Sequence, residues 1–129
     1  MQNDPSKTYY LSGHLDLTDR EFDAHYAAAI AAAFEEGARF VVGDARGADT
    51  MCQRALAALG CDRTTVYHMF ESPRNNAWNF KTVGGFGTDE DRDAAMTAAS
   101  DADIAWVRPG RERSGTAKNL QRRTGKGGQ

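Results

Sequence analysis

The sequence predicts an α/β fold: a single Rossmann-like three-layer domain with a mostly parallel sheet of four or five strands and helices on both faces. Two observations predict this class. Short apolar runs alternate along the chain with stretches of helical periodicity, as crossovers between parallel strands require. The 129 residues also show no break in composition, which suits one domain. We place that domain at residues 7–123, after a disordered start at 1–6 and before a flexible glycine-rich tail at 124–129.

The first predicted strand covers residues 7–12 and leads into the longest predicted helix. Thr18 and Glu21 form a capping box at the start of this helix, and Gly37 ends it. The helix is rich in alanine, and its larger apolar side chains recur at helical spacing. Its expected core face consists of Phe22, Tyr26, Ile30, Ala33 and Phe34.

The rest of the chain continues the alternation of strand and helix. A strand at 39–43 precedes a helix that begins after Gly47 and stops at Gly60. The β-branched and aromatic run at 64–70 predicts a third strand. Glycine, proline and asparagine recur through residues 71–87, which we therefore predict to be irregular. The remaining elements are a helix from Thr88 to about Ser100, a strand at 103–107 and a terminal helix that starts at Ser114.

The start of the terminal helix is a predicted anion site. A cationic turn at 108–113 separates the last strand from Ser114-Gly115-Thr116. A helix start presents unpaired backbone N–H groups, and the helix dipole favours negative charge there. Ser114, Gly115 and Thr116 are therefore candidate ligand-binding residues, and phosphate is the expected guest.

A second candidate junction follows the second strand. Gly43 and Gly47 permit tight turns and a close approach of the backbone to a ligand. Asp44 could accept hydrogen bonds from ribose hydroxyls, and Arg46 could pair with phosphate. Alternatively, Asp44, Arg46 and Asp49 form an internal salt bridge and a helix cap. Because ligands gather at the carboxyl ends of parallel strands, we rank Asp44 first as a catalytic carboxylate.

The loop after the first strand supplies three more candidates. Ser12, Gly13 and His14 stand where that strand ends, on the predicted ligand side of the sheet. His14 could contact a base or a phosphate, or it could be structural. Asp91 and Asp93 are weaker candidates, because acidic residues are favourable in the first turn of a helix without any ligand.

The long segment after the third strand has a similar ambiguity. Long loops in compact domains often act as lids or binding loops. In that role Arg74 would pair with phosphate, and Trp78 or Phe80 would stack on a base. In the alternative, the aromatic side chains fold the loop onto the body or form a contact between copies of the chain.

Composition and charge exclude several classes of protein. A net charge of −2 gives no electrostatic case for duplex DNA or an anionic membrane, so we expect no nucleic-acid partner. The chain lacks a signal-peptide pattern and any run near the roughly 18 apolar residues of a membrane span, which predicts a cytoplasmic protein with no membrane partner. Cys52 and Cys61 are too few for a disulfide framework, and we expect no metal and no cofactor.

Residues 43–49 resemble the GxxxGAD element of the SLOG superfamily, a Rossmann-like group that contains LOG, DprA and YspA-like proteins. Ser114-Gly115-Thr116 resembles the later Gly-Thr phosphate element of that group. Residues 93–119 are also similar to nucleoside 2-deoxyribosyltransferases, with an acidic helix, a strand and an SGTA segment. These resemblances imply a nucleotide or nucleoside-derivative ligand, chemistry at an N-glycosidic bond, and sites completed across a homo-oligomer. Asn119 stands where the similar enzymes place a catalytic glutamate.

Three functions follow. We predict binding of a nucleotide or nucleoside derivative at the carboxyl end of the sheet, with cleavage or transfer at its N-glycosidic bond. The alternative is a non-catalytic sensor or binding module for the same ligand. The third is a nucleic-acid accessory protein that uses the basic residues between Arg108 and Lys126. The predicted site has Asp44 as its catalytic residue and the following ligand-binding residues: Ser12, Gly13, His14, Gly43, Asp44, Arg46, Gly47, Asp49, Arg74, Ser114, Gly115, Thr116 and Asn119.

Overall fold

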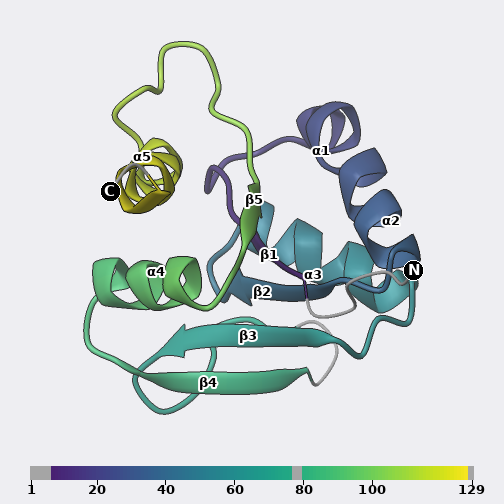
Figure 1. The fold of residues 1–129 in the computed structure, drawn as a ribbon, viewed down its shortest axis with the longest axis horizontal. Helices are drawn as coiled ribbons and strands as arrows, with labels where there is room; N and C mark the ends of the chain where they lie inside the picture. The colour runs from purple at the N-terminus through teal and green to yellow at the C-terminus, as the bar shows by residue number, and fades with distance from the viewer. Residues whose placement is uncertain (1–6, 77–79, 128–129) are drawn as a thin grey trace.

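The computed structural model describes residues 7–76 and 80–127 and confirms the predicted fold class. The described chain forms one five-stranded sheet, in which all paired strands are parallel. Its elements in chain order are β1 (Thr8–Leu11), α1 (Asp19–His25), α2 (Ala27–Glu35), β2 (Arg39–Gly43), α3 (Ala48–Ala58), β3 (Thr64–Met69), β4 (Lys81–Phe86), α4 (Asp89–Ala98), β5 (Ala102–Ile104) and α5 (Gly115–Gly127). Helices α1, α2 and α3 lie on one side of the sheet, and α4 and α5 lie on the other (Figure 1).

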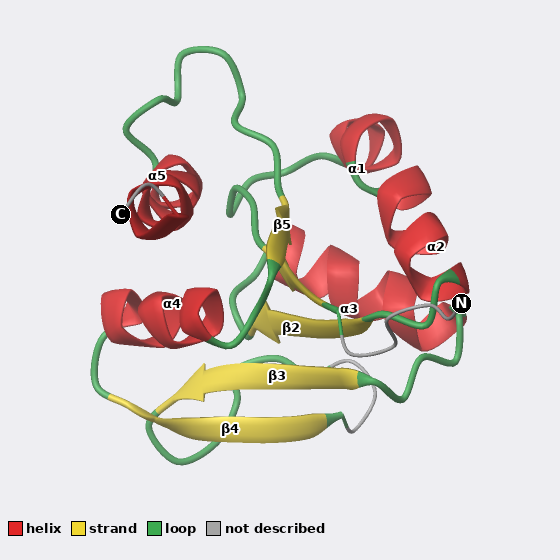
Figure 2. Ribbon diagram, viewed as in Figure 1, coloured by secondary structure: helices red, strands yellow, loops and turns green. Residues whose placement is uncertain are grey.

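The strand order is β4-β3-β2-β1-β5. The chain therefore builds outward from β1 to β4 and then returns to place β5 on the far side of β1 (Figure 2). Leu11 near the end of β1 pairs with Val42 of β2 on one side and with Ile104 of β5 on the other. Such a reversal is a topological switch point, where open α/β sheets bind their ligands beyond the carboxyl ends of the strands.

Two apolar clusters of unequal size cover the faces of the sheet. The larger cluster packs β1, β2 and β3 against the α1 to α3 layer, and its largest members include Leu11, Tyr26, Ile30, Phe40 and Leu56. The smaller cluster lies on the α4 side and consists of Tyr10, Val41 and Met96, with Tyr67 against it. Because parallel sheets are usually covered by apolar side chains on both faces, this thin cluster leaves room for polar groups on the α4 and α5 side.

The long helix predicted from the alanine-rich run is interrupted at Tyr26. This residue ends α1 and precedes α2, with a φ of −124°. Its ring is buried, and its hydroxyl donates to the carbonyl of Ser12 at 2.7 Å. The same hydroxyl accepts a hydrogen bond from the backbone N–H of Trp106 at 3.0 Å. Tyr26 therefore ties the helical layer to the ends of both β1 and β5.

Strand β4 lies within the segment 71–87 that the sequence predicts to be irregular. It forms an edge of the sheet, and five of its six residues are exposed, so the alternation of buried and exposed side chains is missing. Gly84 and Gly85 also weaken the strand signal. Gly85 has a φ of +91°, and the pairing with β3 shifts register near it. Such an irregularity is common at sheet edges, where it hinders pairing with other chains.

The last strand and the last helix differ from their predicted bounds. Strand β5 ends at Ile104 instead of continuing to residue 107, because the N–H of Trp106 bonds to Tyr26 rather than to a neighbouring strand. Helix α5 runs to Gly127 and so includes residues 124–127 of the predicted flexible tail. The predicted disordered start at 1–6 and the final residues 128–129 lie outside the described chain.

Candidate functional site

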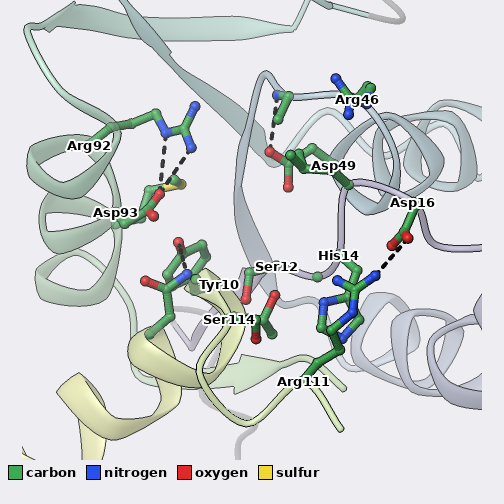
Figure 3. A pocket seen from close by; sticks show the side chains of 17 residues that line it. Tyr10, Ser12, His14, Asp16, Arg46, Asp49, Arg92, Asp93, Arg111 and Ser114 are labelled. Atoms are coloured by element: carbon green, nitrogen blue, oxygen red, sulfur yellow. Dashed lines mark hydrogen bonds and ion pairs between the residues drawn. The ribbon is translucent and has the colours of Figure 1, made fainter. Parts of the chain in front are cut away.

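The candidate site is a cavity of about 490 Å³ at the carboxyl ends of β1 and β2, between α4 and α5 (Figure 3). Its volume falls within the range of small-molecule and cofactor sites. Four segments line it: the end of β1 with its following loop, the turn after β2 with the start of α3, the inner side of α4, and the start of α5 with the loop before it. The cavity therefore lies at the switch point between β1 and β5, as the topology predicts.

Most residues that the sequence selects as ligand-binding line this cavity. They are Ser12, Gly13, His14, Arg46, Asp49, Ser114, Gly115, Thr116 and Asn119. Four other predicted residues do not line it, namely Gly43, Asp44, Gly47 and Arg74. The rest of the lining consists of Tyr10, Leu15, Asp16, Ala45, Arg92, Asp93, Met96 and Arg111.

The start of α5 forms a wall of hydrogen-bond donors. The Ser114 hydroxyl caps the helix by accepting the N–H of Ala117 at 3.1 Å, so this hydroxyl is already used. The N–H groups of Gly115 and Thr116 precede the first helical hydrogen bond and have no partner in the described chain. These two groups and the helix dipole favour an anion in the cavity.

His14 is held in one protonation form by the loop after β5. Its Nε2 accepts the backbone N–H of Arg108 at 2.8 Å, which requires that Nε2 carry no proton. Burial of the ring, together with the charges of Arg108 and Arg111, lowers the pKa of His14 below its usual range. The imidazole is therefore neutral near pH 7, with its proton on Nδ1 as a donor on the cavity wall.

Ser12 provides a fourth donor. The residue is only 5% exposed, and its Oγ has no hydrogen-bond partner in the described chain. A buried hydroxyl without a partner costs about 1–3 kcal/mol, which a ligand oxygen in the cavity could offset. Ser12 and His14 follow β1 directly, so the same strand end positions both side chains.

Ion pairs hold the loop at 105–114 over the cavity. Arg108 pairs with Glu21 at 2.7 Å and with Asp16 at 3.2 Å, and Arg111 pairs with Asp16 at 2.8 Å. The hydrogen bonds from Arg108 lower the pKa of Glu21 to about 2. Arg46, on the opposite side of the opening, is exposed and has no ion-pair partner in the described residues. The rim therefore presents Arg46 and the outer part of Arg111 to an incoming anion.

Two carboxylates besides Asp16 line the cavity, Asp49 at the start of α3 and Asp93 on α4. Asp49 Oδ2 accepts the N–H of Ala45 at 3.1 Å, and burial raises the pKa of Asp49 to about 7. Asp93 Oδ1 accepts hydrogen bonds from Arg92 at 3.1 and 3.3 Å. Burial raises the pKa of Asp93 as well, although Arg92 opposes the effect. This part of the cavity therefore disfavours phosphate and favours a donor group.

Both ends of the Asn119 side-chain amide form hydrogen bonds with neighbouring side chains. Its Nδ2 donates to the Tyr10 hydroxyl at 2.9 Å, and its Oδ1 accepts from Arg122 at 2.7 Å. The amide thus fixes α5 against β1 in the position where the similar enzymes carry a catalytic glutamate.

Asp44 lies in the interior beneath the site, outside the cavity lining. The residue is fully buried, and its Oδ1 receives Arg74 and Arg92, each at 2.8 Å. Its Oδ2 receives the backbone N–H and the Nε of Arg74 at 2.8 and 3.2 Å. Burial acts to raise the pKa of Asp44, but these bonds outweigh it and lower the pKa. Asp44 is therefore in an internal salt bridge, although with Arg74 and Arg92 in place of the expected Arg46, and no carboxylate oxygen is free for catalysis.

The two predicted junction glycines also have structural roles. A Cβ at Gly43 would overlap the carboxylate of Asp49. Gly47 has a φ of +76°, and a Cβ there would overlap the backbone of Leu15. These glycines let the turn after β2 pass close to Asp49 and the loop after β1.

The long segment after β3 is tied to the turn after β2 instead of covering the cavity. Arg74 pairs with Asp44, and the Asn75 side chain donates to the Asp44 carbonyl at 2.9 Å. Phe80 is buried in the larger core cluster and does not line the cavity. It therefore packs the loop onto the body of the domain and does not stack on a base. Trp78 lies outside the described residues.

The described residues contain no group of three His, Cys, Asp or Glu side chains that could hold a metal ion. Within the same part of the chain, no helix is both long and apolar enough to span a membrane.

Fold and site together define a Rossmann-like α/β domain with a donor-lined cavity at its switch point. No protein-family model and no curated protein matches the sequence. A solved structure of DNA processing protein A from Helicobacter pylori, described for its single-stranded DNA binding mode, is similar in fold. The two share 19% sequence identity with a TM-score of 0.66, over 92% of this chain and 62% of that chain.

This likeness corrects two expectations from the sequence. We expected a small nucleotide or nucleoside derivative, either cleaved at its N-glycosidic bond or sensed, and we expected no nucleic-acid partner. The solved protein with the similar fold is described for single-stranded DNA binding, which conflicts with both expectations. The comparisons give no support to an N-glycosidase, a hydrolase or a homo-oligomer.

Sequence reasoning missed part of the lining because it considered loops more than strand and helix interiors. Tyr10 could have been found, since residues two apart in a strand share a face and Ser12 was already a candidate. Arg92 and Met96 lie four apart on one side of α4. Asp93, which we assigned to the first helical turn, is the fifth residue of α4 and lines the cavity.

Proposed function

We propose that this domain binds single-stranded DNA and that the cavity receives part of the strand, with a backbone phosphate at the start of α5. The donor wall carries the proposal. Ser12 Oγ, His14 Nδ1 and the N–H groups of Gly115 and Thr116 line one cavity, and none has a hydrogen-bond partner in the described chain. A phosphodiester offers only acceptor oxygens, so it matches such a wall.

The likeness to DNA processing protein A supports the same proposal. A single-stranded DNA-binding protein with this fold shows that the architecture is compatible with such a ligand. We also infer that the domain is of the SLOG type, on the GxxxGAD-like residues 43–49 and the Ser114-Gly115-Thr116 helix start. This chain spans less than two thirds of the solved protein, so the inference covers strand binding alone.

The distribution of charge is compatible with a nucleic-acid partner despite the net charge of −2. Arg46, Arg113 and Lys118 are exposed and form no ion pair in the described chain. Arg108 and Arg123, by contrast, are bound to carboxylates and do not contribute to a free basic patch. At physiological salt, charges separated by more than about 8 Å are largely screened, so the residues near the cavity dominate.

The shape of the cavity favours a single strand over a duplex. Its donors are recessed, because Ser12 and His14 are 5% and 3% exposed. A paired and stacked base cannot leave a duplex without an energy cost of a few kcal/mol, whereas a single strand presents unstacked nucleotides. A volume of about 490 Å³ is suited to one such unit of the strand.

Fluorescence anisotropy of a labelled oligothymidine tests this function. The wild-type chain should bind it saturably and should bind a duplex of the same length more weakly. Ser12→Ala removes one donor to a charged phosphate and should weaken binding by about tenfold. Ser72→Ala, an exposed serine outside the cavity, is the matched control and should bind as the wild type does. No saturable binding at low salt, or equal affinities for Ser12→Ala and the wild type, would contradict the proposal.

A further inference from the structure

One acceptor in the cavity remains unmatched after a phosphate is placed on the donor wall. Asp49 is 7% exposed, and its Oδ2 is used by the N–H of Ala45. Its Oδ1 has no hydrogen-bond partner in the described chain and points into the open space of the cavity (Figure 3). The other lining carboxylates differ, because Asp93 is bonded to Arg92 and Asp16 to Arg108 and Arg111.

The nearby charge of Arg92 offsets only part of the cost of burying Asp49, so a donor from a ligand would stabilise its Oδ1 further. Leaving it unpaired costs more than leaving a neutral group unpaired, because the charge is poorly solvated. The raised pKa of Asp49, about 7, reflects this burial and agrees with a site that lacks its donor. At about pH 8 the carboxylate is mostly ionised and accepts hydrogen bonds only.

The chemistry of a DNA strand limits which group can meet Asp49. Internal phosphodiesters carry no proton, and internal deoxyriboses carry no free hydroxyl. The only donors left are N–H groups on base edges. Guanine alone places two donors, N1–H and the N2 amine, side by side. Adenine and cytosine each offer one amine beside a ring nitrogen, and thymine offers one N–H between two carbonyls, so none of them presents two adjacent donors.

We propose that Asp49 selects guanine, by accepting the N1–H and N2–H donors of one base on its unpaired Oδ1 while Ser12, His14 and the start of α5 hold an adjacent phosphate. This inference rests on the proposed single-stranded DNA binding and adds base preference to it. The cavity supports the arrangement, because Asp49 belongs to the start of α3 whereas the donors belong to the loop after β1 and to α5.

Binding of pentanucleotides at about pH 8 tests the inference, since short strands offer few alternative registers. Thymidine strands with a central guanine, inosine or thymine should bind the wild type in that order of affinity. A pair of hydrogen bonds to one base is worth about 1–3 kcal/mol, so guanine should exceed thymine by about fivefold or more. Inosine keeps N1–H but lacks the N2 amine, and should lie between them.

Two isosteric variants test whether the guanine preference depends on the Asp49 acceptor or only on the negative charge in the cavity. In Asp49→Asn the amide oxygen can still accept the Ala45 N–H, so a donor replaces Oδ1 and the preference for guanine should disappear. Asp93→Asn removes the same charge from the same cavity, where Arg92 already occupies the carboxylate. It should keep the guanine preference, and both variants should bind the all-thymine strand at least as tightly as the wild type.

The outcomes distinguish this inference from the proposed function. If the wild type binds all three strands equally, or if Asp49→Asn retains the guanine preference, the inference fails and single-stranded binding stands. If no strand binds, the proposed function itself fails. A uridine RNA pentamer that binds more tightly than its DNA counterpart, without a guanine preference, would overturn the inference by assigning the donor to a ribose 2′-hydroxyl. If Asp49→Asn does not fold, the order of wild-type affinities for the strands with a central guanine, inosine or thymine tests the inference without the variant.

Discussion

Asp44 was ranked first as a catalytic carboxylate from the sequence, but its contacts give it a structural role. Its carboxylate binds two arginines from distant parts of the chain, with Arg74 before β4 and Arg92 in α4. It thereby joins the turn after β2 to both of these segments. The arrangement also places the guanidinium of Arg92 next to Asp93 at the cavity wall.

We predict that Asp44→Ala destabilises the protein strongly. Removing one partner of a buried ion pair leaves uncompensated charge, at a cost of about 3–5 kcal/mol. Urea denaturation should show this loss in the free energy of unfolding. Asp62→Ala, at an exposed aspartate with no ion pair in the described chain, should change it by less than about 0.5 kcal/mol. A loss below about 1 kcal/mol for Asp44→Ala would show that the three-residue cluster contributes little.

At the residue scale, the sequence identified several residues of the cavity but not the side chains with which Asp44 forms its ion pairs. Ser12, His14 and Asp49 were found because strand ends and glycine-rich turns are visible in the sequence. The pairing of Asp44 with Arg92, 48 residues away, was not visible, because it depends on which side of the sheet α4 covers. Loop and charge patterns carry no information on such long-range pairs.

At the scale of elements, the turn between β2 and α3 depends on the backbone freedom of Gly47. Its φ of +76° and ψ of −126° lie in a region that side chains avoid. We predict that Gly47→Ala lowers the free energy of unfolding by more than about 2 kcal/mol, from backbone strain plus overlap with Leu15.

Gly60 provides the matched control for this measurement. It has a similar φ of +70°, but a Cβ there would meet nothing within 4 Å. Gly60→Ala should therefore cost only the backbone strain, about 1–2 kcal/mol. Thermal or urea melts of the two variants give the comparison, and equal losses would show that the approach of Leu15 to Gly47 is unimportant.

Helix α5 and the turn before it should supply the electrostatic part of strand binding. Each phosphate contact on a single strand contributes about 0.7 to the slope of log affinity against log salt. Replacing both Arg113 and Lys118 by alanine should therefore reduce the slope by about 1.4. Arg54→Ala, on the exposed side of α3 and away from the cavity, should leave it unchanged. Anisotropy titrations over a range of salt concentrations measure both, and an unaltered slope in the double variant would place the phosphates elsewhere.

The elements that the sequence predicted correctly are those with a clear periodicity. Strands β1, β2 and β3 and helix α3 appear close to their expected bounds, because buried positions repeat in them. Strand β4 was missed because an exposed, glycine-containing edge strand has no buried face to create a pattern. The break at Tyr26 was missed for a different reason, since it accompanies hydrogen bonds to β1 and to the segment after β5.

At the scale of the whole molecule, the net charge of −2 was a poor basis for the expectation of no nucleic-acid partner. The total of −2 includes carboxylates that are already bound to arginines, such as Asp44 and Asp103. What an incoming strand meets is the local set of exposed cations and recessed donors. The unpaired cations and hydrogen-bond donors around the cavity therefore say more about the ligand than the net charge of the chain does.

Stability should depend on pH through Asp49. Its pKa is raised from 3.8 to about 7, so its contribution to stability is complete below about pH 4 and is lost as pH rises through 7. Asp49→Asn removes this dependence. Compared with the wild type, the variant should gain up to about 4 kcal/mol between pH 4 and pH 8, at about 1.4 kcal/mol per pKa unit. Urea melts at several pH values measure the difference, and a constant difference would show that Asp49 is not perturbed.

We propose that one cavity at the end of the sheet receives a single DNA strand. Amide NMR of the ¹⁵N-labelled chain during titration with oligothymidine tests it most directly, because it reports both binding and location. We expect saturable shifts centred on Ser12, His14, Gly115 and Thr116, and much smaller shifts along the edge strand β4. Shifts centred on β4 or on the outer face of α3, or none at all, would contradict it.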